Sequence, residues 1–183
     1  GMPLFRYMSD LPRTGKTGTV WNYNTNETNL TGEILSRAID QDLSVYLENK
    51  IWQPYGMESE ANWMLTYQNG LEYGGCCLSA TLRDYARLGL FVLDELKKAP
   101  DDDSVLPPGW MGELSPAQAF NGYGYFWWLL GDGIYAAEGI FGQVIWIDSK
   151  NNLVIALQSS WRRAWSDSLE AEWMAFMSAL SKE

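Results

Sequence analysis

Histidine is missing from all 183 residues of the chain. Without it, the chain cannot supply a Ser-His-Asp or Cys-His mechanism, and it lacks the commonest zinc ligand. We expect no metal site. Any hydrolytic chemistry in this sequence must use a base other than histidine.

Cysteine is almost missing as well, because the only two residues of this type, Cys76 and Cys77, are adjacent. A bridge between neighbouring residues departs from ordinary disulfide geometry. We therefore expect two free thiols. The pair gives no reliable indication of the redox compartment.

Basic residues and long hydrophobic runs are also scarce. Lysine and arginine together number 13 against 23 acidic residues, which leaves a net charge of −10. This charge argues against nucleic acid or an anionic membrane surface as a partner, because both present phosphate. No run of roughly 18 or more apolar residues is present, so the sequence encodes no transmembrane helix.

Aromatic residues are abundant instead, with 10 tryptophans among them. Such residues build either a heavy core or a wall that faces a substrate, and composition alone favours neither. The hydrophobic content of 46% is ordinary for a globular protein. A chain of this length can bury one core, so we expect one domain.

Helical spacing characterises much of the first two thirds of the chain. Apolar residues recur at that spacing from Leu30 onward and predict a helix over 27–39. A second helix is expected over about 42–54, and a third follows an apolar stripe over 82–96. Between them, residues 58–73 are predicted to be irregular or short-stranded.

From residue 121 the pattern becomes that of strands and turns. Strands are predicted at 123–130, 134–138, 142–148 and 153–159. Asp132-Gly133 is a strong hairpin signal, so we expect a meander of three or four antiparallel strands. A helix over about 164–181 should cover this sheet, because an apolar sheet face must be buried. Its predicted apolar face consists of Trp165, Leu169, Trp173, Phe176, Met177 and Leu180.

A polar, turn-prone stretch places Tyr23 just before the first predicted helix. Residues 21–32 read WNYNTNETNLTG. They resemble the Tyr-x-Asn box and following helix of the serine beta-lactamase-like and penicillin-binding-protein-like hydrolases, which include class C beta-lactamases, esterases and nylon-oligomer hydrolases. Thr25 stands where beta-lactamases carry Asn, which favours the esterase and amide-hydrolase branch. Local sequence alone offers an alternative, in which Tyr23 is a packed aromatic in a turn.

Two further blocks follow in the same order as in this family. Residues 74–79, GGCCLS, resemble a glycine-rich segment near the family's cleft, and residues 136–143, AAEGIFGQ, resemble its third box. In the third box, Ala137-Glu138-Gly139 replaces Lys-Thr-Gly. That departure is typical of the esterase and nylon-oligomer-hydrolase branch.

The resemblance implies roles for particular residues. Tyr23 is expected to act as general base or acid, and the backbone N–H of Ile140 is expected to be one donor of an oxyanion hole. The implied substrate-binding residues are Thr25, Cys76, Trp127, Trp128 and Gly139. No cofactor is implied, because the family's acyl chemistry needs no metal. The structural alternatives are that Cys76 only packs, and that Gly139 and Gly142 only bend an edge strand.

The nucleophile of this family is not found in the chain. The family attacks with the serine of Ser-x-x-Lys, and no serine here has lysine three residues later. In the family, this motif lies upstream of the tyrosine box. We therefore expect the C-terminal part of an α+β beta-lactamase/transpeptidase-like fold. It would be a single incomplete domain over 1–183, mainly helical over 1–120, with antiparallel strands and a C-terminal helix over 121–183.

Two functions remain open at this point. One is a serine hydrolase that cleaves a small-molecule ester or amide through an acyl-enzyme, of which this chain alone is inert. The other is a non-catalytic ligand-binding module or degenerate paralogue with an aromatic-rich cleft. Missing sheet strands would expose a sheet edge, so we also expect a homo-oligomer formed through that edge.

Overall fold

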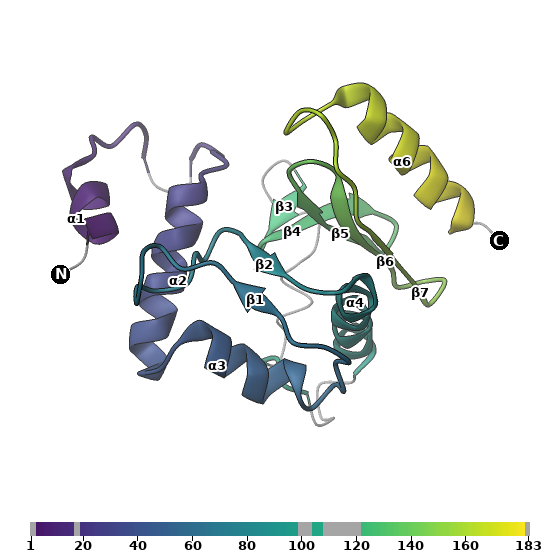
Figure 1. Ribbon diagram of the computed structural model, residues 1–183. Coiled ribbons are helices and arrows are strands. Elements are labelled where there is room, and N and C mark those ends of the chain that lie inside the picture. The colour runs from purple at the N-terminus through teal and green to yellow at the C-terminus, as the bar shows by residue number, and fades with distance from the viewer. Residues whose placement is uncertain (1–2, 17–18, 99–103, 108–121, 182–183) are drawn as a thin grey trace. The chain divides into compact units, whose positions relative to one another are not determined.

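The computed structural model describes residues 3–16, 19–98, 104–107 and 122–181. The chain divides into two compact units, Gly1–Ala80 and Thr81–Glu183. The predicted α+β class is confirmed, because helices precede a five-stranded antiparallel sheet and a C-terminal helix follows it (Figure 1). That the units form one domain stays a prediction. Within the described ranges, no helix combines the length and apolarity needed to cross a bilayer.

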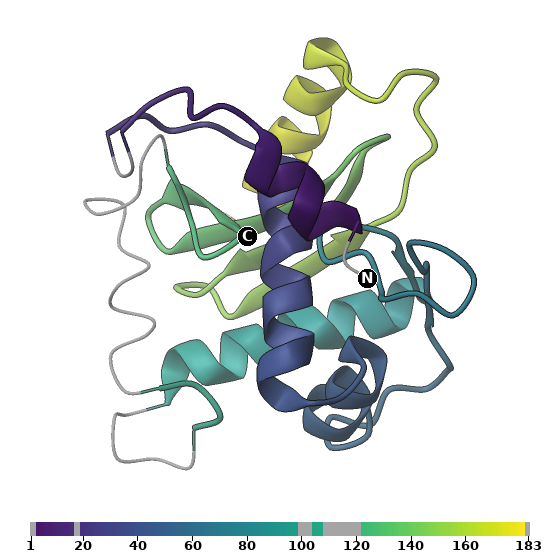
Figure 2. The ribbon, with the colours of Figure 1, turned by 90° about the vertical axis from the view of Figure 1, so that its left-hand side faces the viewer.

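The first unit is mainly helical. Helix α1 (Pro3–Asp10) lies beside α2 (Thr25–Ile39) (Figure 2), and α3 (Leu43–Leu47) continues into the π-helical turn η1 (Glu48–Trp52). These elements confirm the predicted helices over 27–39 and 42–54. Helix α2 ends where Asp40 takes a left-handed backbone (φ 53°), a common way for a helix to stop.

A short ladder completes the first unit. Strands β1 (Asn62–Trp63) and β2 (Leu78–Ser79) pair antiparallel. Beside them, the buried carboxylate of Glu72 accepts hydrogen bonds from the N–H groups of Leu43 and Ser44, at 3.3 and 3.0 Å, and so caps α3. Burial opposes its charge, but these bonds and one from the Ser44 hydroxyl hold the pKa of Glu72 below its ordinary value.

Two glycines bring α2 directly onto the segment that precedes β2. A Cβ added to Gly32 would lie 2.8 Å from the Cα of Gly74, and a Cβ added to Gly74 would lie 2.8 Å from the carbonyl oxygen of Thr28. Only residues without a side chain allow two backbones to approach so closely. The glycine-rich block at 74–77 therefore packs directly against α2.

The second unit is built on a five-stranded meander in chain order. Its strands are β3 (Tyr123–Gly124), β4 (Trp127–Gly131), β5 (Ile134–Gly139), β6 (Gln143–Asp148) and β7 (Leu153–Leu157). The expected number of three or four strands is wrong by one. Tyr125 and Phe126 take left-handed backbone (φ 50° and 69°), so a tight turn divides the predicted strand 123–130 into β3 and β4. The hairpin at Asp132-Gly133 is confirmed.

Helices cover both faces of this sheet (Figure 1). On one face, α4 (Leu82–Lys97) packs Leu93 against Ile145 and Ile147 of β6. On the other, α6 (Asp167–Leu180) packs Trp173 and Met177 against β5 and β6. The predicted helix over 82–96 and the covering role of the last helix are both confirmed.

The predicted apolar face of the last helix is partly wrong. Trp165 precedes α6 and is 48% exposed, and Phe176 is 55% exposed, whereas Trp173 and Met177 are buried. The reason is geometric: side chains four residues apart lie above one another on a helix, and this single line makes the contact with the sheet. The aromatic residues beside that line remain at the surface.

Candidate active site

The first unit places Tyr23 immediately ahead of a well-capped helix. Asn24 is the N-cap of α2: its backbone is extended and its side-chain oxygen accepts a hydrogen bond from the N–H of Asn26 at 3.0 Å. The ring of Tyr23 lies 6.2 Å from that of Trp21, and its side chain is 55% exposed. The structure thus presents a solvent-accessible phenol at the positive end of a 15-residue helix dipole.

A hollow of about 520 Å³ opens beside this box. Asn22, Asn24 and Glu27 of the box region line it on one side. Arg13 and Lys16 of the preceding segment contribute cationic side chains to the same lining. Its charged lining thus consists of two cations and the carboxylate of Glu27, and Tyr23 is not among the described residues that line it.

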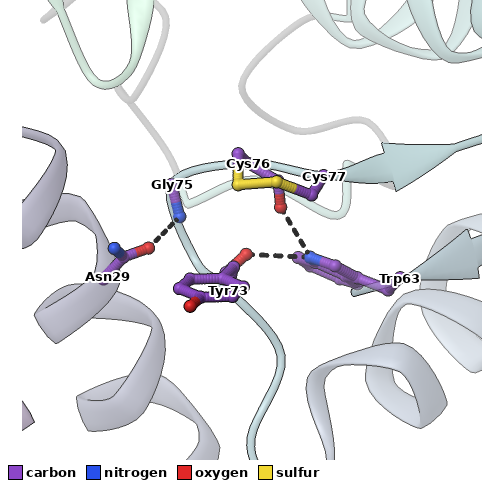
Figure 3. The surroundings of a disulfide bond; sticks show 6 residues. All are labelled: Asn29, Trp63, Tyr73, Gly75, Cys76 and Cys77. Atoms are coloured by element: carbon purple, nitrogen blue, oxygen red, sulfur yellow. Dashed lines mark hydrogen bonds between the residues drawn. A yellow bond between two sulfur atoms is a disulfide. The ribbon is translucent and has the colours of Figure 1, made fainter. Parts of the chain in front are cut away.

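The glycine-rich block lies against α2, where Asn29 reaches Gly75 (Figure 3) and Thr25 lies close to the same glycine. The N–H of Gly75 donates to the side-chain oxygen of Asn29 at 2.7 Å. A Cβ added to Gly75 would lie 3.0 Å from the Cγ2 of Thr25. Cys76 therefore follows a residue that packs on the first turn of α2. Thr25 therefore lies in contact with the residue that precedes Cys76.

The expectation of two free thiols is wrong. Cys76 and Cys77 form a disulfide, with their Cα atoms 3.7 Å apart (Figure 3). In an extended strand, neighbouring side chains point to opposite sides. Cys77 instead takes a left-handed backbone (φ 76°), which changes the direction of its side chain relative to that of Cys76. The sequence pattern gave no sign of this backbone conformation.

The second unit places Ile140 in an exposed turn between β5 and β6. The N–H of Gly142 donates to the carbonyl of Gly139 at 3.3 Å, and Phe141 has φ 69°, so residues 139–142 form a type II turn. The side chain of Ile140 is 65% exposed. Among the described residues, the Ile140 N–H has no hydrogen-bond partner. It is therefore available to an acceptor from outside this part of the chain.

A strap after β7 fixes this turn. The N–H of Phe141 donates to the carbonyl of Ala164 at 3.0 Å, and the N–H of Trp161 donates to the carbonyl of Phe141 at 3.1 Å. A Cβ at Gly142 would overlap the indole of Trp161, so this position must be glycine. These contacts hold Phe141 in the left-handed conformation that the turn requires and that a bulky residue otherwise disfavours.

Trp127 and Trp128 point to opposite faces of the sheet. Trp127 packs in the cluster beneath α4, and Trp128 packs in the cluster beneath α6. This follows from the alternation of side chains along β4. A single cleft can use only one of the two rings, and their roles in substrate binding stay predictions.

Glu138 is a half-buried acid next to Gly139. It faces the α6 side of β5, and burial, reinforced by the negative charge of Glu170, raises its pKa from 4.5 to about 7. Burial and the charge of Asp167 raise the pKa of Glu170 as well. A carboxylate that titrates near neutral pH therefore lies within two residues of the Ile140 turn.

Because the pKa of Glu138 is raised in the folded chain, we predict that the free energy of unfolding falls as the pH rises. Between about pH 4.5 and 7 the folded chain keeps a proton that the unfolded chain has lost, so the stabilisation present at low pH disappears on passing pH 7. Glu138→Gln cannot ionise and should be more stable than the native chain at pH 8 by on the order of 2 kcal/mol, with little difference at pH 4. Urea unfolding at both pH values measures this.

The matched control for that experiment is Glu172→Gln, which removes an exposed carboxylate of α6. It should leave the pH dependence of the native chain unchanged. Equal pH dependence in Glu138→Gln and the native chain would contradict the assignment.

Sequence reasoning missed three residues that shape these two arrangements. Asn29 holds Gly75, Trp63 donates its indole N–H to the carbonyl of Cys76 at 3.0 Å, and Trp161 seats the Ile140 turn. For Asn29 and Trp161, the available signal was the glycine that each contacts, because a glycine can mark a close approach of the backbone. Nothing in the sequence pattern pointed to Trp63. No group of three or more His, Cys, Asp and Glu side chains in the described part of the chain is arranged to hold a metal ion.

The fold and the tyrosine box define a serine beta-lactamase-like protein, and the family comparison agrees. The family model described as Beta-lactamase matches residues 2–175. The chain therefore belongs to the beta-lactamase family.

Individual relatives extend this finding. The 6-aminohexanoate-dimer hydrolase of Paenarthrobacter ureafaciens is 25% identical over 173 residues, which are 86% of this chain and 43% of that protein. The solved structure named "Putative 6-aminohexanoate-dimer hydrolase from Bacillus anthracis" superposes with a TM-score of 0.82 at 23% identity, over 97% of this chain and 48% of that one. This chain thus spans less than half the length of both relatives.

A second solved structure is more distant. A protein from Bacteroides dorei DSM 17855, named "putative beta-lactamase", superposes with a TM-score of 0.61 at 16% identity, over 94% of this chain and 63% of that one. At these identities the two structural likenesses show the fold.

Proposed function

We propose that this chain is the C-terminal part of a serine hydrolase that cleaves small-molecule ester or amide bonds through an acyl-enzyme. The observation that carries the proposal is the exposed phenol of Tyr23 at the capped N-terminus of α2, in a chain of the beta-lactamase family. The relative from Paenarthrobacter ureafaciens acts, by its name, on the 6-aminohexanoate dimer, which contains an amide bond. This name supports an amide or ester as the substrate class.

The proposed mechanism divides the work between Tyr23 and the backbone N–H of Ile140. Tyr23 takes the proton of the attacking serine and returns it to the leaving group, so it acts first as base and then as acid. The Ile140 N–H stabilises the negative charge that develops on the carbonyl oxygen of the substrate. The serine and lysine come from a Ser-x-x-Lys helix upstream of residue 1. Thr25, Cys76 and Gly139 contribute to the substrate site.

A serine-directed fluorophosphonate tests whether the nucleophilic serine lies outside these 183 residues. The 183-residue chain should remain unlabelled, because none of its serines lies in Ser-x-x-Lys. The product of the same gene extended upstream should take up one equivalent, at the serine of that motif. Intact-mass spectrometry measures both. Stoichiometric labelling of a serine within the 183 residues would contradict the proposal, and an extended product without the motif would favour a non-catalytic binding module.

We also propose that the isolated chain forms a homo-oligomer through the edge of β7. Among the described residues, β7 pairs only with β6, and its sequence LVIAL carries neither the charge nor the proline that commonly protects a sheet edge. Two such edges are self-complementary when they pair antiparallel about a two-fold axis. The second copy of this chain is therefore the partner that fits the edge.

Light scattering and hydrogen exchange test this association. The measured mass should rise to that of a dimer or larger assembly as the concentration increases, and amides of β7 should gain protection over the same range. The control is β5, which is already paired on both sides and should not change. A stable monomer at high concentration would count against the interface.

A further inference from the structure

The disulfide between Cys76 and Cys77 is placed where a reagent in solution can reach it. Both residues are exposed. Thiol–disulfide exchange requires that an attacking thiolate approach a sulfur directly, so access governs the rate. The fold does not bury the bridge as a staple between distant elements, because it joins two neighbouring residues (Figure 3).

Hydrogen bonds from Trp63 and Met64 hold the backbone around the bridge. The indole N–H of Trp63 donates to the carbonyls of Tyr73 and Cys76, at 2.8 and 3.0 Å. The carbonyl of Cys77 accepts from the N–H of Met64 at 3.1 Å. A change in the backbone at 76–77 must therefore disturb defined hydrogen bonds.

A further contact connects the bridge with the tyrosine box, through Gly75. Gly75 precedes the bridge, donates its N–H to Asn29 and packs closely on Thr25, whose Cγ2 would lie 3.0 Å from an added Cβ. Thr25 is the first residue of α2 and lies two positions after Tyr23. A movement of Gly75 would therefore change the packing on the first turn of α2.

The bridge includes a residue with an unfavourable backbone conformation. Cys77 holds a left-handed backbone (φ 76°), which residues with a side chain rarely adopt. The covalent bond restrains Cys77 there. Once the bond is broken, the residue is free to leave this region and to draw Cys76 and Gly75 with it.

We infer that Cys76 and Cys77 form a reversible thiol–disulfide exchange site, whose reactant is a small dithiol or a dithiol protein and whose redox state sets the position of Gly75 on α2. Through Thr25, a shift of Gly75 would also move Tyr23, and the importance of that movement for catalysis rests on the proposed function. A thiolate of the reductant attacks one sulfur, forms a mixed disulfide and releases the other cysteine as a thiolate, which takes up a proton. The second thiol of the reductant then closes its own disulfide, and the chain is left with two thiols.

The first measurement uses the native chain and dithiothreitol under non-denaturing conditions. Mass spectrometry should show a gain of two hydrogens and full alkylation of two thiols after reduction. In a separate sample that is reduced but not alkylated, one equivalent of phenylarsine oxide should bind, because trivalent arsenic joins two adjacent thiols and releases water. A bridge that resists dithiothreitol until the chain is unfolded would overturn the inference.

The second measurement follows the amide signals of Gly75 and of the Asn29 side chain by NMR. Both should shift on reduction, while amides of β6 in the second unit stay unchanged. The variant Cys76→Ser/Cys77→Ser should resemble the reduced chain. The variant Cys76→Ser/Cys77→Gly also lacks the bridge, but glycine accepts the left-handed backbone, so it should resemble the oxidised chain.

Two results would contradict the coupling. Reduction without any change at Gly75 and Asn29 would leave the bridge without influence on α2. Loss of hydrogen-exchange protection throughout α2 would show that the bridge is a structural staple. Neither readout requires hydrolase activity, so the coupling and the proposed hydrolase function can fail separately.

Discussion

In a hydrolase that contains this chain together with an upstream Ser-x-x-Lys helix, Tyr23→Phe should lower kcat by about 10²–10⁴-fold, the usual contribution of a positioned proton-transfer group. The substitution keeps the ring beside Trp21 and removes only the hydroxyl. KM should change little, because the hydroxyl acts in proton transfer and contributes little to ground-state binding. Steady-state hydrolysis of an activated ester measures both parameters.

The control for this variant is Tyr67→Phe. Tyr67 is another exposed tyrosine of the first unit, at 57% exposure, and lies outside the box. The same chemical change there should leave kcat unaltered. If Tyr23→Phe retains the native kcat, Tyr23 is a packed aromatic and the proposed proton transfer is wrong.

Ile140→Pro should lower kcat by about 10²–10³-fold in the same hydrolase, the usual cost of losing one oxyanion donor. Proline has no N–H, and it is favoured at the second position of a type II turn, which Ile140 occupies. The substitution should therefore remove the donor and keep the turn. Circular dichroism and thermal unfolding of the variant measure whether the fold is kept.

Ile140→Ala is the matched control, because it shortens the exposed side chain and keeps the N–H. Its kcat should stay within a small factor of the native value. Equal losses in the alanine and proline variants would assign the effect to the side chain, and an active proline variant would remove Ile140 from the oxyanion hole.

The elements with local signals were predictable from the sequence. Helix α2 has apolar residues at helical spacing and an asparagine at its N-cap, and both signals lie within a few residues of each other. The β4–β5 hairpin is signalled by Asp132-Gly133, whose backbones are both left-handed (φ 51° and 83°). In both places, the local preference and the tertiary fold agree.

The features that depend on contacts between distant residues were not predictable. Trp161 reaches the turn at Gly142 across a whole hairpin, and no spacing rule connects the two positions. The disulfide between Cys76 and Cys77 depends on a left-handed cysteine, which sequence preference disfavours. The separate strand β3 likewise depends on left-handed backbone at two aromatic residues, Tyr125 and Phe126.

The candidate site was predicted with similar limits. The box at 21–32 correctly placed Tyr23 ahead of a helix, because a capping residue and a helix can be read locally. Sequence alternation along β4 could have shown that Trp127 and Trp128 face opposite sides of the sheet. The pKa of Glu138 depends on burial beneath α6 and on the charge of Glu170, and neither is visible in the sequence.

The sequence of the source DNA upstream of Met2 shows whether this chain belongs to a hydrolase with a Ser-x-x-Lys nucleophile. We predict a reading frame that continues upstream of Met2 and encodes Ser-x-x-Lys at the start of a predicted helix. A stop codon in that frame, followed by initiation signals at Met2, would contradict it. Tyr23 and Ile140 would then lose their catalytic roles, and the binding of a ligand by this chain would become the question.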